Sequence, residues 1–299
     1  MNKRILKTGA LAVAVTIAFA LFAYQAAKWS FDTQPGVAAL GQRTITDNDP
    51  CSASGAEQPG IPTTKIIPQL AFGSFDSGLS NYTTIIEIVN ISGGPQNIAA
   101  RFYKDDGSAL DNVALKLGDS TINDGVLAAT QVPEGGILVI SGGGNSSRGI
   151  LGWSRITACG GVSIAAFFEL RDVTRNLLVG RSAIAAGPGN LSSFVMPRIR
   201  EVLAGLDVAF AVVNTAEAAA TLKAEVKDAS GKTVASKDLV LGPRSQRTGF
   251  TKEIFTDLKD DNNRIYQYLK FTSTSPSFAA IALAIEGGIQ TNFPVEVVP

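Results

Sequence analysis

The chain has 299 residues, which is enough for a leader and two domains of roughly 100 to 150 residues each. Its 26 basic and 26 acidic side chains balance, so no overall field would steer the protein onto nucleic acid, and we expect no nucleic-acid partner. Histidine is absent, which excludes Ser-His-Asp and Cys-His nucleophiles and removes the commonest zinc ligand.

The N-terminus has the pattern of an export signal. Lys3, Arg4 and Lys7 precede an uncharged, largely apolar stretch over residues 8–27. This stretch of about 20 residues could cross a bilayer as a helix, whereas a cleaved signal needs only about 7 to 15 apolar residues and small residues at the cut. Because Tyr24 would occupy a small-residue position before a cut after Ala26, we favour a membrane anchor helix over residues 1–27. Removal as a signal peptide at an atypical site is the alternative.

The anchor would hold the rest of the chain outside the cytoplasm. The positive end should stay in the cytoplasm, so the body is expected in the periplasm or at the cell surface. Residues 28–65 are rich in Gly, Pro, Ser, Thr and Asp and show no hydrophobic period. We interpret them as a flexible linker that spans roughly 30 to 35 Å.

The remaining chain contains an internal repeat. The segment Ile85–Asn90 resembles Ala209–Asn214, and in both copies a turn glycine, Gly107 or Gly231, follows the asparagine after 17 positions. Such regular spacing indicates a repeated structural unit.

Shorter similarities extend the repeat in both directions. The aliphatic-Pro segment Ile66–Leu70 resembles Phe194–Arg198, and Trp153–Thr157 resembles Leu269–Thr272. Phe293-Pro294-Val295 resembles the opening segment once more, which suggests that each unit ends with the type of strand that opens the next.

The local pattern within each copy is that of β-strands. Apolar Ile98, Ala100 and Phe102 alternate with their neighbours, the period of a half-buried strand. Turn residues recur every 8 to 15 positions, and only Lys252–Leu258 could form a helical turn. We therefore predict an all-β chain with two tandem antiparallel β-sandwich domains, at residues 66–190 and 191–299.

These motifs resemble the tandem Ig-like β-sandwich repeats of exported bacterial proteins. The shared features are the aliphatic-Pro opening, the Val-Asn strand end and the Asp-x-Gly hairpin, and the resemblance covers residues 66–299. It implies an extracytoplasmic module and transfers no functional residues. The second copy departs from it because it has no tryptophan at the position of Trp153.

Cys51 and Cys159 are the only cysteines. In an oxidising compartment two cysteines suggest one disulfide, which would tie the end of the linker to the first sandwich. Two free thiols, one exposed and one packed, are the alternative. With only two thiols and no imidazole, no metal site and no cofactor are predicted.

Acidic side chains offer two further candidates. A loop gathers oxygen ligands of the kind calcium prefers, but their spacing fits no calcium-loop motif and Lys259 lies among them, so we predict a solvated loop; its residues are Asp257, Asp260, Asp261, Asn262 and Asn263. Glu169 and Glu286 end comparable strands, and paired carboxylates serve glycoside hydrolysis. Because they lie in different domains, solvent-facing strand ends are the preferred interpretation.

Aromatic side chains give the last candidate site. Tyr266 and Tyr268 share one strand face and could stack on a sugar, whereas Trp153 lies in an alternating strand and should pack in a core. The sequence thus favours a non-enzymatic envelope protein with a structural or interaction role and an unknown protein or glycan partner. A carbohydrate-binding protein that uses Tyr266 and Tyr268 is the first alternative, and a carboxylate-dependent hydrolase is the second.

Overall fold

The structure is a computed structural model that describes residues 51, 62–75, 79–142, 148–201, 206–258, 264–286, 289–293 and 295–298. The predicted anchor at residues 1–27 and, apart from Cys51, the predicted linker up to residue 61 lie outside the described residues. Strand β1 begins at Thr63, before the predicted domain start at residue 66.

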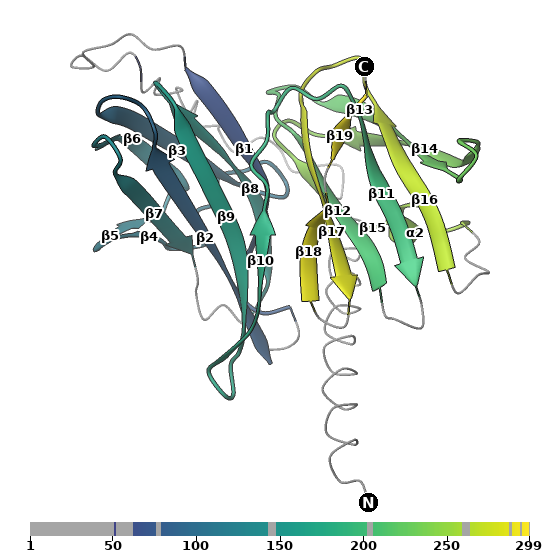
Figure 1. Cartoon of the computed structure of the whole chain (residues 1–299), viewed down its shortest axis with the longest axis horizontal. Helices are drawn as coiled ribbons and strands as arrows, with labels where there is room; N and C mark the ends of the chain where they lie inside the picture. Colours follow the sequence, from purple (N-terminus) through teal and green to yellow (C-terminus); the bar gives the residue numbers. More distant parts are fainter. Residues whose placement is uncertain are drawn as a thin grey trace, which may run out of the picture.

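Two series of strands make up the described chain (Figure 1). The N-terminal half contains β1 (Thr63–Phe72), β2 (Ser80–Asn90), β3 (Gln96–Lys104), β4 (Leu115–Leu117), β5 (Ser120–Ile122), β6 (Val126–Val132), β7 (Ile137–Gly142), β8 (Ile150–Ala158), β9 (Val162–Asp172) and β10 (Leu177–Ile184). The C-terminal half contains β11 (Ser193–Glu201), β12 (Leu206–Asn214), β13 (Ala220–Lys227), β14 (Thr233–Leu241), β15 (Gln246–Phe250), the short helix α2 (Thr251–Ile254), β16 (Arg264–Thr272), β17 (Phe278–Glu286), β18 (Ile289–Phe293) and β19 (Glu296–Val297).

The strands form three open antiparallel sheets, which confirms the all-β prediction. In the N-terminal half a sheet in the order β1-β8-β3-β6 accompanies a sheet in the order β10-β9-β2-β7-β4-β5. In the C-terminal half one continuous sheet runs β14-β13-β16-β11-β12-β17-β18, with β15 on β12 and β19 on β11. Among the described residues, a single pair, Glu201 with Leu206, joins β11 to β12, so the two ends of this sheet can fold over each other with a core between them.

The order of strand pairing is the same in both halves. Strand β8 lies between β1 and β3 as β16 lies between β11 and β13, and β9 lies between β10 and β2 as β17 lies between β18 and β12. Strands β7 and β15 pair with β2 and β12. Outside the register shift of β1 between Ile67 and Leu70, residues of these strands therefore correspond between the halves; Tyr103 pairs with Trp153 where Lys227 pairs with Tyr268.

The two repeated asparagines occupy the same structural position. Asn90 at the end of β2 is buried, and its Nδ2 donates to the carbonyl oxygens of Gly94, Val132 and Pro133 at 2.8 to 3.0 Å. Asn214 at the end of β12 is also buried, and its Nδ2 donates to three corresponding carbonyls, those of Ala218, Leu241 and Gly242. Each asparagine thus donates to the last residue of a strand and to two turn residues, and it satisfies their backbone carbonyls.

Asn90→Ala and Asn214→Ala are each expected to lower the free energy of unfolding by about 2 to 3 kcal/mol, because each leaves one buried and two partly buried carbonyls without this donor. Urea denaturation measures the loss, and the exposed Asn123→Ala serves as the control, with little change expected. A loss below about 0.5 kcal/mol at both buried positions would contradict this role.

The third copy of the opening segment is a wrong prediction. Phe293 lies in β18 and pairs with Ala282, as Ile184 in β10 pairs with Ala166. After β18 the chain reaches β11 through β19, where Glu296 pairs with Val195, and Gly187 after β10 reaches β1 in the corresponding place. Phe293 and Val295 pack against the core of the C-terminal half, so this segment closes that half and does not open another unit.

Candidate interaction interface

The two halves of the chain pack against each other, and each buries the outer surface of one of its sheets in this contact. Side chains from Ile66 to Phe72 of β1 are all buried, and so are those from Phe210 to Asn214 of β12. The corresponding strands β11 and β2 alternate between buried and partly exposed side chains. A strand that is buried on both sides has a second layer over its outer face, and here that layer is the other half of the chain. Figure 1 shows β1 and β10 beside β17 and β18, where the halves meet.

Each half has two outer sheet surfaces, one on its first sheet and one on its second. The docking face of a half is the outer side of its first sheet, on β1, β8 and β3 or on β11, β16 and β13. The receiving face is the outer side of its second sheet, on β2, β7 and β9 or on β12, β15 and β17. Inside the chain, the docking face of the N-terminal half lies on the receiving face of the C-terminal half.

Trp153 lies at the centre of this contact. Its side chain is fully buried in a cluster with Ile66, Tyr103, Val213 and Ala279, which come from both halves. The indole stacks on Tyr103 with ring centroids 4.4 Å apart, and its Nε1 donates to the carbonyl oxygen of Arg244 at 2.7 Å. The prediction that Trp153 packs in a core holds, but the core is the one between the halves, which explains why the second copy has no tryptophan there.

Arg244 holds an unusual backbone conformation at this contact. Its φ of 54° lies in the left-handed region, where the corresponding residue of the N-terminal half is Gly135 with a φ of 66°. Its guanidinium lies 5.8 Å from the centroid of Tyr103 and forms an ion pair with Glu217 at 3.1 Å. The strained backbone is compensated by this side-chain packing and by the bond from Trp153. Burial raises the pKa of the Tyr103 hydroxyl.

Gln246 supplies the polar part of the contact. Its Nε2 lies within hydrogen-bond distance of the carbonyl oxygens of Pro68 and Gly152 and of Oε1 of Gln69, at 2.6 to 3.1 Å. Its backbone N–H donates to the carbonyl of Asp105 at 2.8 Å. Buried polar groups of β1 and β8 are thereby satisfied across the junction, which fixes the position of one half on the other.

The repeated turn glycine also contributes to this junction. Gly107 has a φ of 86°, and a Cβ there would lie 2.3 Å from the carbonyl oxygen of Pro243. The glycine is therefore required both for the turn and for the close approach of the two backbones. Gly231, its counterpart, has a φ of 84° and contacts no backbone at such a distance.

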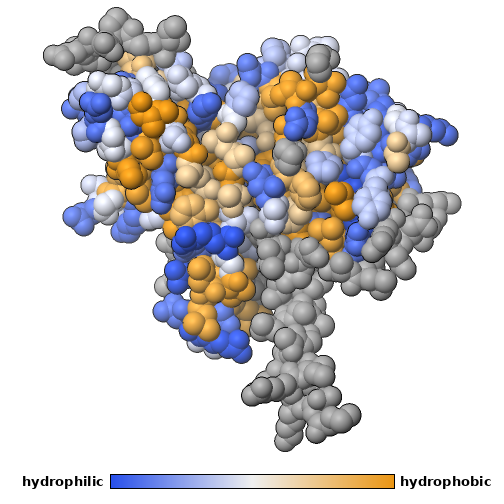
Figure 2. Space-filling model, viewed as in Figure 1, coloured by the Kyte–Doolittle hydropathy of each residue, from blue (hydrophilic) through white to orange (hydrophobic). Residues whose placement is uncertain are grey.

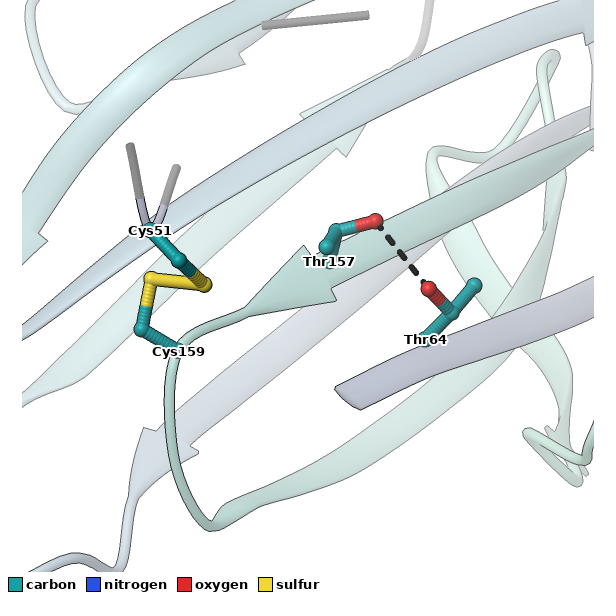
Figure 3. Close-up of a disulfide and its surroundings, with 4 residues drawn as sticks. All are labelled: Cys51, Thr64, Thr157 and Cys159. Carbon is teal, nitrogen blue, oxygen red and sulfur yellow. Dashed lines mark hydrogen bonds between the residues drawn. A yellow bond between two sulfur atoms is a disulfide. The ribbon is translucent and has the colours of Figure 1, made fainter. Parts of the chain in front are cut away.

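The two cysteines are joined in a disulfide. Cys51 and Cys159 have Cα atoms 5.2 Å apart, and the bond ties the segment before β1 to the residue that follows β8 (Figure 3). Beside it, Oγ1 of Thr64 lies 3.4 Å from Oγ1 of Thr157. The bond therefore fixes the chain close to the start of β1, the strand that is buried between the two halves.

The tyrosine pair lies on the docking face of the C-terminal half. Tyr266 is 56% exposed and its hydroxyl donates to Oε1 of Glu201 at 2.9 Å. Tyr268 is half-buried, next to Pro197 and Lys227 on the neighbouring strands. Both rings are thus on one side of β16, as their spacing predicts.

The two glutamates do not occupy corresponding positions. Glu169 pairs across the sheet with Thr83, whose counterpart Asp207 pairs with Ile285 and not with Glu286. Glu169 is buried between Arg181 and Arg171, and the hydrogen bond from Arg181 holds the pKa of its carboxyl below the usual range. An ion-paired carboxylate on one sheet supports a structural role for Glu169.

Glu169→Gln is expected to cost about 1 kcal/mol of stability at pH 7, because both arginines of the pair are half exposed to solvent. A carboxyl whose pKa is lowered on folding stabilises the fold above its unfolded pKa, near 4.5, and loses this contribution as the pH falls. Urea denaturation should show a smaller difference between wild type and variant at pH 3 than at pH 7. An equal difference at both pH values would contradict the ionic role.

Other candidate sites find no support in the described residues. No group of three or more acidic, cysteine or histidine side chains could hold a metal ion in the part of the chain that the structure describes. Of the predicted acidic loop, Asp257 is described, whereas residues 260–263 lie outside the described residues. Among the described residues, no helix combines the length and apolarity needed to cross a bilayer.

Comparison with known proteins does not assign the chain to a family. No protein-family model matches the chain, and no curated protein matches its sequence. Sequence reasoning missed Arg244 and Gln246 as interface residues, because neither stands in a motif. The available signal was the unbroken apolar character of Val208–Val213 in β12, where the corresponding segment of β2 carries Thr84 and Glu87.

Proposed function

We propose that the protein is a non-catalytic interaction module of the bacterial cell envelope. In this proposal residues 66–190 and 191–299 are tandem Ig-like β-sandwich domains, the segment over residues 8–27 holds them at the membrane, and residues 28–65 act as the linker. The disulfide between Cys51 and Cys159 supports an oxidising, extracytoplasmic compartment. The repeated pairing order and the repeated asparagine sites support the tandem arrangement.

The observation that carries the interaction role is the receiving face of the N-terminal half. Its counterpart in the C-terminal half is covered, but here Ile91 is 64%, Ile137 62% and Val139 44% exposed in the structure. Val89 and Phe167 lie on the same side of the sheet and are half-buried. Figure 2 shows hydrophobic residues gathered on the visible side of the N-terminal half. Glu87 and Ser163 lie among these apolar side chains on the same side, and a surface that mixes exposed aliphatic and polar groups is typical of a non-obligate protein interface.

Site-specific photo-crosslinking in cells tests this role. A photoreactive residue at position 137 should give a discrete crosslinked product, because an apolar face in contact with a partner lies within reach of the probe. The control is position 240 on the edge strand β14: Val240 is 74% exposed, and its counterpart Gln131 stays exposed as well. Absence of a product at position 137, or equal products at both positions, would contradict the proposal.

The compartment can be tested separately. In spheroplasts, protease added from outside should digest the body of the membrane-bound protein, because the anchor leaves everything after residue 27 outside the cytoplasm. Alkylation without reduction should leave both cysteines unmodified. A protease-resistant body with two reactive thiols would place the protein in the cytoplasm and contradict the assignment.

A glycan-binding role is the second candidate, favoured by the exposure of Tyr266 beside Tyr268 on one strand. Aromatic rings on one sheet face can stack on sugar rings, which present apolar faces of their own. A glycan array with the full chain tests it, and binding that Tyr266→Ala and Tyr268→Ala abolish would place this function first. No binding to any glycan would exclude it.

A further inference from the structure

We propose that two copies of this chain associate head to tail, with the docking face of the C-terminal half of one copy on the receiving face of the N-terminal half of the next. This inference rests on the proposed interaction function and names its partner. Within the chain one docking face already covers one receiving face, and the remaining face of each kind stays partly exposed. A second copy offers the free docking face that can cover this free receiving face in the same way as the two faces meet inside the chain.

The aromatic centre of the internal contact has a counterpart on the free docking face. Trp153 corresponds to Tyr268, which is also aromatic and also carries one hydrogen-bond donor. Inside the chain, the indole of Trp153 donates to the carbonyl of Arg244. The residue that corresponds to Arg244 in the N-terminal half is Gly135. Gly135 is exposed, and its left-handed φ matches that of Arg244, so the carbonyl can point outward in the same way.

The charged and aliphatic parts of the contact are kept as well. Arg155, which donates to the carbonyl of Thr215 inside the chain, corresponds to Lys270, and Thr215 corresponds to the exposed Ile91. The aliphatic pair at the junction, Ile66 with Val213, becomes a pair of valines; these are Val195 and Val89. The contact between copies thus has a cationic donor, Lys270, and two aliphatic side chains, Val195 and Val89, at the positions where the internal contact has its own.

Two differences show that the contact between copies is the weaker one. Gln246, with its bonds to three acceptors, corresponds to Ile137, which can offer only apolar area. Tyr103, which stacks on Trp153, corresponds to Lys227, so a stacked aromatic is replaced by a charged side chain that already pairs with Glu225. Such a charged side chain adds less to the contact than a stacked aromatic ring. We therefore infer reversible, concentration-dependent association.

The geometry of the contact predicts open chains of copies. Because a docking face meets a receiving face, the contact is heterologous, and each added copy leaves one face of each kind free. Two variants that each disable one face can therefore still bind each other. Ile137→Glu disables the receiving face of the N-terminal half and keeps the docking face. Tyr268→Glu disables the docking face of the C-terminal half and keeps the receiving face.

Analytical ultracentrifugation of the full chain in detergent, with the solvent density matched to the detergent, tests the proposal. The wild type should gain mass as its concentration rises, and each variant alone should remain monomeric at every concentration. An equimolar mixture of the two variants should reach about twice the monomer mass and stop there, because the only intact pair of faces is then used. Val240→Glu, with its exposed side chain off the contact, should behave as the wild type.

Three outcomes would overturn the proposal, provided that circular dichroism shows both variants folded. They are a wild type that stays monomeric, a mixture that stays monomeric, and dimers formed by either variant alone. The crosslinking experiment separates this failure from that of the proposed function. If position 137 crosslinks to a different protein while the full chain stays monomeric, self-association is wrong and the interaction role stands; if it crosslinks to nothing, both are wrong.

Discussion

Replacing Trp153 with alanine is expected to lower the free energy of unfolding by about 3 to 5 kcal/mol, the cost typical of truncating a buried tryptophan. The indole is fully buried between the halves, stacks on Tyr103 and donates to the carbonyl of Arg244. Its removal leaves a cavity and an acceptor without its donor. Tyr268→Ala at the corresponding exposed face is the matched control and should cost about 1 kcal/mol or less in dilute protein.

The same substitution should also change the form of the unfolding curve. The core of the N-terminal half includes Ala211 and Ile281 from the C-terminal half, so we expect the wild type to unfold in one transition. With the junction weakened, Trp153→Ala should unfold in two transitions by calorimetry, because each half keeps a core of its own. Equal losses for Trp153→Ala and Tyr268→Ala, in single transitions, would contradict the role of the junction.

Loss of the disulfide is expected to have the second large effect. Cys51 and Cys159 are 108 positions apart, and closing a loop of about 100 residues stabilises a protein by up to about 4.7 kcal/mol in the loop-entropy model. Cys51→Ala should therefore lower the free energy of unfolding by about 3 to 5 kcal/mol under oxidising conditions. The N-terminal half should be affected more, because the bond ends beside β1 and β8.

Reduction provides the control for this prediction. In the presence of a reducing agent, wild type and Cys51→Ala should have nearly the same stability, because both then lack the cross-link. If the wild type keeps its full advantage after reduction, the stabilisation comes from packing of the cysteine side chain and the prediction is wrong. Urea denaturation with and without reductant makes the comparison.

Much of the strand pattern could be predicted from the sequence because the repeat carries it. Asn90 and Asn214 accept and donate the same kinds of backbone hydrogen bond, and Gly107 and Gly231 close the same hairpin with a positive φ. The helical turn expected within Lys252–Leu258 is α2, at Thr251–Ile254. Such local features depend on a few neighbouring residues, so the sequence expresses them directly.

The junction between the halves could not be predicted in the same way. Alternation identifies which side of a strand is apolar, but it does not identify what covers the other side. The alternation of its strand predicted that Trp153 packs in a core but not in which one, and the contact with Arg244 joins segments 91 positions apart. The apolar run Val208–Val213 of β12 was the clearest local sign that both sides are buried, whereas in β1 Gln69 interrupts the apolar residues.

Carbene footprinting of corresponding residues tests whether the two halves of the chain cover each other. In dilute full-length protein, Trp153 and Val213 should stay unlabelled, whereas Tyr268 and Ile137 should be labelled. As the concentration rises, labelling at Tyr268 and Ile137 should fall together while that at Val240 stays constant. Equal labelling of Trp153 and Tyr268 in dilute protein would show that the halves do not cover each other and would contradict the buried junction around Trp153.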